Sequence, residues 1–152
     1  NILPSEKAFA YKLKLEAMKH QGKATSSQIG TKLRSDEELA LQVGESRNQI
    51  QRYIRLTNLI DPLLDLVDKN EMAMSAGVEL SYLGTKHQAK IYEVAERESP
   101  PSIAQAVKLR KCAEEGVLDD KIILLFKNKE STFSVNSYQF CFTYTLPPQP
   151  HL

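Results

Sequence analysis

The fold is decided by residues 36–55, DEELALQVGESRNQIQRYIR. In the first half of this stretch, small and apolar residues share one face of a short helix: Leu39, Ala40 and Val43. Gly44 follows, where the chain turns sharply and only glycine adopts a left-handed conformation at little cost. In the second half, apolar side chains again recur at helical spacing: Ile50, Tyr53 and Ile54. The pattern predicts two short helices that cross at a glycine turn, with the small Ala40 at the crossing.

Each of the two predicted helices also begins with a capping signal. Ser35 with Glu38, and Ser46 with Gln49, have the spacing of a capping box. In that arrangement the hydroxyl accepts a hydrogen bond from a free backbone N–H of the first turn. The side chain three residues later accepts a hydrogen bond from the backbone N–H of the capping residue. Two capped helices joined at a glycine are typical of a helix-turn-helix, a DNA-binding motif. An ordinary helical hairpin is the alternative.

The helix-turn-helix interpretation points to a set of DNA-facing residues, because the start of the second helix faces the base edges. Arg can donate two hydrogen bonds to guanine, and Asn or Gln can bind adenine through one donor and one acceptor. Arg47 and Gln51 are the candidates for base contacts, although a phosphate contact or a solvated side chain is the alternative for each. Phosphate contacts are predicted for Arg52 and Arg55. The full predicted set is Ser46, Arg47, Asn48, Gln51, Arg52 and Arg55, with Gln42 and Thr31 nearer the first motif helix.

The charge of the chain is distributed unevenly. The 152 residues have a formal net charge of +1. Residues 1–58 contain 10 Lys or Arg and 6 Asp or Glu, a charge of +4, whereas residues 59–152 contain 10 and 13, a charge of −3. The positive half contains the predicted motif, where Lys and Arg would displace counterions from phosphates. Lysine-rich helix faces that are merely exposed to solvent are the alternative explanation of this charge. Because the positive charge and the predicted motif lie in the same half of the chain, we favour nucleic-acid binding.

Other classes of function find little support in the sequence. No stretch approaches the roughly 20 apolar residues that cross a bilayer, and no secretory signal segment is visible. Cys112 and Cys141 lack partners at metal-ligand spacing, so we expect reduced thiols that take part in packing. Neither a phosphate-binding glycine loop nor a nucleophile motif is present. We therefore expect a cytoplasmic protein with no catalytic residue, metal or cofactor. Because the chain begins at Asn1, we also expect a fragment or a processed product.

The rest of the sequence predicts an all-α domain of about seven or eight helices over residues 1–130. Apolar periodicity and capping residues place these helices at 4–21, at 62–67, from Ser75 to Leu83, from Thr85 to about Arg97, at 102–116 and at 119–126, besides the motif. Residues 131–152 have almost no charge, and aromatic residues alternate along them, which predicts an extended or β-like tail of unknown role. Such a tail would pair with another segment, pack on the helices, or be an artefact of how the fragment was made.

The first 18 residues, NILPSEKAFAYKLKLEAM, resemble the segment that links the two functional modules of ParB-type partition proteins, a group that includes RepB-like and KorB-like proteins. The pattern N-x-x-P-x-E-x-A-x-A-Y falls on Asn1, Pro4, Glu6, Ala8, Ala10 and Tyr11. The resemblance continues through the helix-turn-helix, a leucine-rich short helix from Leu63 to Val67, and the segment from Met74 to Gly77. It covers about residues 1–130.

The resemblance implies the central DNA-binding domain of a partition protein. Such proteins bind palindromic centromere-like sites as homodimers and, with a partner ATPase, segregate plasmids or chromosomes. Relatives on mobile elements use the same motif as transcriptional regulators, which is an alternative function here, as is a helix pair that docks on another protein. The family often has His and then Arg after the glycine at position 77, whereas this chain has Val78 and Leu80 there. This departure favours a plasmid or mobile-element relative. Any nucleotide hydrolysis would belong to an upstream module that these residues do not include.

Overall fold

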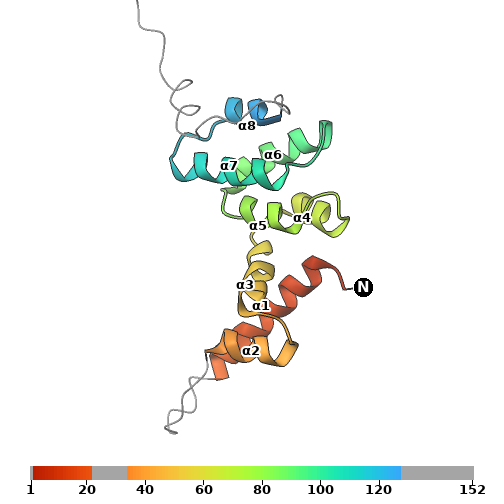
Figure 1. Cartoon of the computed structure of the whole chain (residues 1–152), viewed down its shortest axis with the longest axis vertical. Helices are drawn as coiled ribbons and strands as arrows, with labels where there is room; N and C mark the ends of the chain where they lie inside the picture. The colour runs from red at the N-terminus through yellow and green to blue at the C-terminus, as the bar shows by residue number, and fades with distance from the viewer. Residues whose placement is uncertain (1, 22–33, 128–152) are drawn as a thin grey trace, which may run out of the picture.

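The computed structural model describes residues 2–21 and 34–127, which form eight α-helices and no strand (Figure 1). The helices are α1 (Pro4–Gln21), α2 (Ser35–Val43), α3 (Arg47–Leu56), α4 (Asp61–Asp68), α5 (Met74–Leu80), α6 (Thr85–Arg97), α7 (Ile103–Glu114) and α8 (Asp120–Lys127). The all-α prediction is confirmed, while the predicted tail at residues 131–152 lies outside the described residues. Within the two described ranges, no helix combines the length and apolar character needed to cross a membrane.

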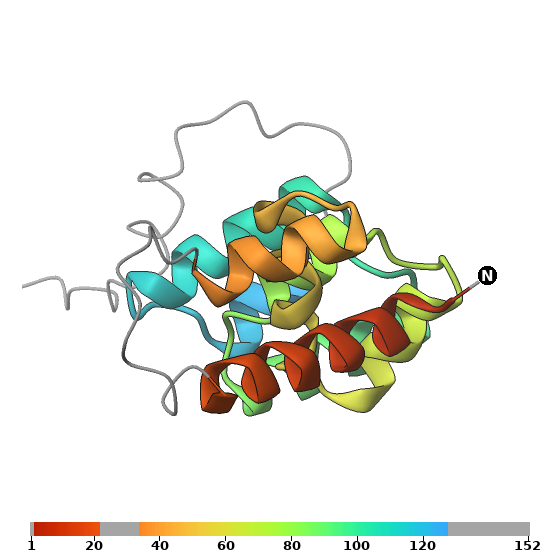
Figure 2. The same cartoon turned by 90° about the horizontal axis from the view of Figure 1, so that it is seen from below.

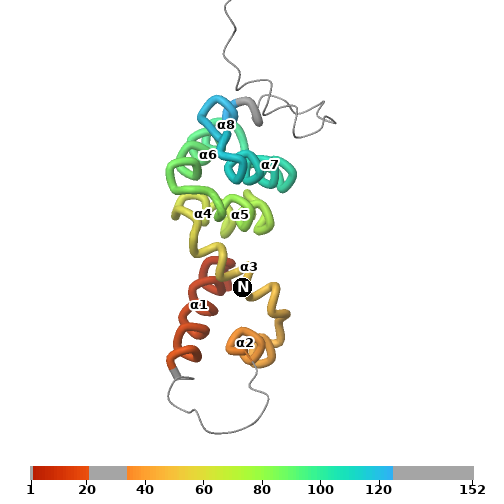
Figure 3. Tube along the Cα trace, turned by 90° about the vertical axis from the view of Figure 1, so that its left-hand side faces the viewer, coloured from red at the N-terminus to blue at the C-terminus, as the bar shows by residue number. Residues whose placement is uncertain are grey.

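The helices are arranged in two groups along the long axis of the molecule. Helices α1, α2 and α3 lie at one end, and α4 to α8 are stacked toward the other (Figures 1 and 3). Seen from below, α1 lies beside the α2–α3 pair (Figure 2), and it packs against both helices and also against α4. Helix α3 contacts α5 as well, so it connects the two groups.

Each group has its own hydrophobic core. The larger cluster is formed mainly by α4 to α8, and Leu56 at the end of α3 and Ala8 of α1 join it. Cys112 lies in this cluster, which confirms its predicted place in the packing. The smaller cluster has three buried side chains, one each from α1, α2 and α3: Leu15, Leu39 and Ile50. Helix α1 therefore completes the core of the predicted motif.

The turn between α2 and α3 has the predicted form. Gly44 adopts the left-handed conformation, with φ of 70° and ψ of 23°, and its N–H donates to the carbonyl of Ala40 at 3.0 Å. Ser46 caps α3, because its Oγ accepts a hydrogen bond from the N–H of Gln49 at 3.2 Å. Two short helices joined by Gly44, Glu45 and Ser46 have the dimensions of a helix-turn-helix.

The predicted capping box of Ser35 and Glu38 is wrong by one residue. Helix α2 already includes Ser35, and Arg34 is the capping residue in extended conformation. The backbone N–H of Arg34 donates to Glu37 Oε2 at 3.2 Å, so Glu37 makes the returning contact instead of Glu38. This register places Asp36 inside the first turn of α2.

The helix predicted from Ser75 to Leu83 also differs from the structure, in which α5 runs from Met74 to Leu80. Ser75 does not cap this helix, because its hydroxyl accepts a hydrogen bond from Arg52 of α3. The helix ends before Ser81, whose hydroxyl donates to the carbonyl of Val78 at 2.6 Å. Ser75 therefore serves a contact that the tertiary structure creates, and Ser81 combines its local bond with one from Arg55 of α3.

A buried glutamine joins two turns of the larger group. Gln88 of α6 is 1% exposed. Its Oε1 accepts from the N–H of Ile60, the residue that precedes α4, at 2.9 Å. Its Nε2 donates to the carbonyls of Asn58 and Leu83 at 3.1 and 2.9 Å. One side chain thus satisfies three backbone groups that would be costly to bury unpaired.

Close packing at Gly77 leads to a stability prediction. A methyl group at this position would lie 3.0 Å from Val67 Cγ2 and 3.2 Å from Leu56 Cδ2. Helix propensity favours Ala over Gly by about 1 kcal/mol, but overpacking of a core costs about 1–3 kcal/mol. We expect Gly77→Ala to lower the free energy of unfolding, measured by urea denaturation.

A Val67→Ala background serves as the control for this substitution. It removes the nearest methyl group, so the cost of Gly77→Ala should shrink in the double variant. A gain in stability for Gly77→Ala alone would show that the neighbouring side chains move aside and that helix propensity dominates.

Candidate nucleic-acid interface

The beginning of α3 presents an exposed polar face. Arg47, Asn48 and Gln51 are exposed, whereas Ile50 on the opposite face is fully buried. Tyr53 and Ile54 are half-buried and pack against the two hydrophobic clusters. The predicted inward side chains are therefore confirmed, and Arg47, Asn48 and Gln51 are exposed as expected, whereas Arg52 and Arg55 are half-buried.

Polar and aromatic contacts from α1 support the turn and α3. The ammonium group of Lys7 donates to Glu45 in the turn at 3.0 Å and lies 5.3 Å from the ring centroid of Tyr53. The hydrogen bond to Glu45 raises the pKa of Lys7 above its ordinary value. The ring of Tyr11 meets the ring of Tyr53 edge-on, with the centroids 5.7 Å apart. Helix α1 thereby contacts both the turn and α3, the second helix of the motif, which we call the recognition helix.

The buried carboxylate of Asp36 connects α2 with the exposed face of α3. Asp36 is 6% exposed. Its Oδ2 accepts from Arg47 Nε at 2.5 Å and from Gln51 Nε2 at 3.3 Å, and its Oδ1 lies 3.3 Å from Arg34 Nε. Burial alone would raise the pKa of Asp36, but the hydrogen bond from Arg47 and the charges of both arginines bring it below its ordinary value. The carboxylate is thus ionised, buried and paired.

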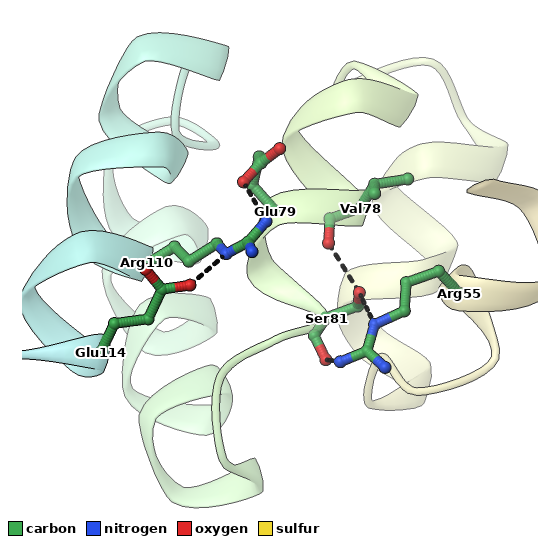
Figure 4. A network of polar contacts seen from close by, with 6 residues as sticks. All are labelled: Arg55, Val78, Glu79, Ser81, Arg110 and Glu114. Atoms are coloured by element: carbon green, nitrogen blue, oxygen red, sulfur yellow. Dashed lines mark hydrogen bonds and ion pairs between the residues drawn. The ribbon is translucent and has the colours of Figure 1, made fainter. Parts of the chain in front are cut away.

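The other two arginines of α3 contact the second group of helices. Arg52 Nη2 donates to Ser75 Oγ at 2.6 Å. Arg55 donates from Nε to Ser81 Oγ at 3.2 Å and from Nη2 to the Ser81 carbonyl at 3.1 Å (Figure 4). Both side chains are therefore held by contacts within the protein, and each keeps further N–H groups beyond these bonds.

A half-exposed tyrosine extends the Arg55 contact to α7. The guanidinium carbon of Arg55 lies 3.9 Å from the ring centroid of Tyr82, and that of Arg110 lies 3.7 Å from it. Arg110 is paired with Glu79 at 3.1 Å and with Glu114 at 2.7 Å (Figure 4). This cluster fixes the far end of α3 against α5 and α7.

The remaining predicted residues are placed as follows. Ser46 is exposed at the start of α3, Gln42 is exposed on α2, and Thr31 lies outside the described residues.

The sequence interpretation missed Asp36 as a partner of the recognition helix. A signal was present, because Asp36 precedes Leu39, Ala40 and Val43 by three, four and seven residues and so belongs to the inward face of α2. Across residues 2–21 and 34–127, no cluster of three His, Cys, Asp or Glu side chains is placed to bind a metal ion.

Comparison with known proteins agrees with this geometry. A family model described as "ParB HTH domain" matches residues 31–111, which is more than half of the chain. The chain belongs to this family. The matched range contains the helix-turn-helix and α4 to α6, and it ends within α7, whereas α1 precedes it. No curated protein and no solved structure gave a match. The chain is therefore a ParB-like DNA-binding protein with a helix-turn-helix.

The ion pair of Asp36 with Arg47 predicts a measurable dependence on pH. Because the folded-state pKa of Asp36 is lowered from 3.8, this carboxylate stabilises the fold above that value, and the contribution is lost as pH falls through the lowered pKa. In Arg47→Ala, the buried carboxylate of Asp36 loses its closest positive partner. We therefore expect the pKa of Asp36 to rise and acid destabilisation of the fold to begin at a higher pH. An NMR titration of the carboxyl carbon measures this shift.

Arg97→Ala is the matched control, because it removes an exposed arginine at the end of α6. It should leave the titration of Asp36 unchanged. The same Asp36 pKa in Arg47→Ala and in the unsubstituted protein would show that Arg47 does not determine the ionisation of Asp36.

Proposed function

We propose that this protein binds double-stranded DNA in a sequence-specific manner, at a palindromic centromere-like site used in the partition of a plasmid or chromosome. The observation that carries the proposal is the exposed face of Arg47, Asn48 and Gln51 at the capped start of α3. Membership of the ParB HTH domain family supports DNA as the partner. The proposed role is one of binding, and no residue is given a catalytic function.

In the proposed complex, the start of α3 enters the major groove. Arg47 donates two hydrogen bonds to guanine, and Gln51 or Asn48 binds adenine through a donor and an acceptor. Each such pair would contribute about 1–3 kcal/mol of discrimination between bases. Ser46 lies where a helix N-terminus favours a phosphate.

Phosphates on either side of the groove would be met by residues around α3. Arg52 and Arg55 approach them with the N–H groups that Ser75 and Ser81 do not use. Gln42 and Thr31 are proposed to contact the backbone nearer to α2. These contacts set affinity and orientation, and they carry no direct sequence information.

A palindromic site needs two copies of the reading helix, with half-sites about 34 Å apart. We therefore propose a homodimer on DNA that works with a partner ATPase in the cytoplasm, where the plasmid or chromosome lies. A plasmid-retention assay tests the partition role. Repression of an adjacent promoter without any effect on retention would favour a transcriptional regulator.

Salt dependence distinguishes DNA binding from docking on another protein. We expect duplex affinity, measured by fluorescence anisotropy, to fall steeply between low and moderate salt, because each phosphate contact contributes a slope of about −0.9 to log K against log salt. Absence of binding to any duplex at low salt would contradict the proposal.

Arg47→Ala tests whether α3 reads bases. A selection from a random duplex pool first identifies the preferred site, which we expect to be palindromic. Arg47→Ala should then weaken binding to that site more than binding to random duplex, by about tenfold or more if a bidentate pair is lost. Arg97→Ala removes the same charge from the other group of helices and should change neither affinity much. Equal losses on both duplexes in Arg47→Ala would make Arg47 a backbone contact.

A further inference from the structure

We propose that Asp36 is a specificity-determining residue that positions Arg47 and Gln51 for base recognition. Asp36 itself would not touch DNA, because it is buried between α2 and α3 and acts through these two side chains. The inference deepens the proposed function, on which it rests.

The contact with Arg47 leaves the recognition end of the guanidinium available. Asp36 binds Nε, the nitrogen nearest the aliphatic stem, at 2.5 Å. In the described part of the chain, Nη1 and Nη2 form no hydrogen bond, and Glu37 Oε1 lies 4.0 Å from Nη1. A guanine needs two donors for O6 and N7. Arg47 can therefore bind guanine through its terminal nitrogens while Nε stays on Asp36.

The contact with Gln51 orients an amide that would otherwise rotate freely. An ionised carboxylate only accepts hydrogen bonds, so it selects the orientation in which Nε2 of Gln51 faces Asp36 at 3.3 Å. The amide oxygen and the second N–H of this exposed side chain remain available. Adenine recognition requires this combination of one acceptor and one donor.

Because Asp36 is buried, its contact with Arg47 should favour specific over non-specific binding of DNA. If Arg47 turned away to bind a phosphate, the carboxylate would keep Arg34 but lose its closest partner, and breaking a buried ion pair is unfavourable. Binding to guanine through Nη1 and Nη2 preserves the ion pair, whereas a phosphate contact that draws Nε away from Asp36 breaks it. The negative charge also weakens attraction to every duplex. Only the preserved ion pair raises the ratio of specific to non-specific affinity, because the negative charge weakens binding to every duplex alike.

Asp36→Asn tests the inference, since it removes the charge and retains the size of the side chain. We expect higher affinity for random duplex and a specific-to-non-specific ratio that is lower by about tenfold, the discrimination of one bidentate pair. The lost preference should map to the base pairs that Arg47→Ala and Gln51→Ala identify in a duplex-pool selection. A change confined to those base pairs cannot come from a general loss of structure.

Glu38→Gln is the matched control, because it removes one negative charge from the same helix at an exposed position with no ion pair among the described residues. Its ratio of affinities should stay that of the unsubstituted protein. The inference would be overturned if Asp36→Asn kept the wild-type base preferences, or if it lost base preference evenly over the whole site. An equal effect of Glu38→Gln on the ratio of affinities would overturn it as well. The proposed function would survive those results, whereas a wild-type protein that selects no sequence would end both.

Arg47→Lys provides a second test, which stands even if Asp36→Asn fails to fold. Lys keeps the charge but has a single nitrogen, so the atom that would bind Asp36 is the same atom that would have to reach O6 and N7 of guanine. We expect the guanine preference to disappear while non-specific affinity and its salt slope are retained. A retained guanine preference would overturn the positioning role of Asp36.

Discussion

The recognition helix depends on three buried side chains, one from each of the first three helices: Leu15, Leu39 and Ile50. Helices α2 and α3 have 9 and 10 residues, too few for a stable isolated helix. Full burial of one such side chain contributes about 1.5–3 kcal/mol, so each of the three matters. Helix α1 supplies one of them and braces the turn through Lys7, and the motif is therefore a three-helix unit.

The three-helix unit is attached to the second group of helices by polar contacts at both α1 and α3. At the start of α1, the N–H and the hydroxyl of Ser5 donate to the carboxylate of Asp68 at the end of α4, at 2.9 and 2.5 Å. A carboxylate there also complements the dipole of α1. At the end of α3, Arg55 binds Ser81 and stacks on Tyr82. Helices α1 and α3 are thus attached to α4 and to the end of α5.

The polar side chains of α3 form contacts within the protein itself, in the absence of DNA. Asp36 binds Arg47 and Gln51 on one side, and Ser75 binds Arg52 on the other. Ordering long side chains on binding costs about 0.5–1.5 kcal/mol each, and contacts already present in the protein reduce that cost. The same contacts restrict where each guanidinium can point, which links order to selectivity.

Helical periodicity and turn chemistry are local properties of the chain, so the amino-acid sequence was enough to predict the helix-turn-helix, the left-handed Gly44 and the exposed face of Arg47, Asn48 and Gln51. The resemblance of the N-terminal segment also indicated the family that the match at residues 31–111 shows. The partners of the α3 side chains could not be predicted in this way, because they depend on how separate helices pack. Asp36, Ser75 and Ser81 lie 11 to 26 residues from their partners, and packing of separate helices brings them together. The predicted cap at Ser75 failed for the same reason, because its hydroxyl binds Arg52 of another helix.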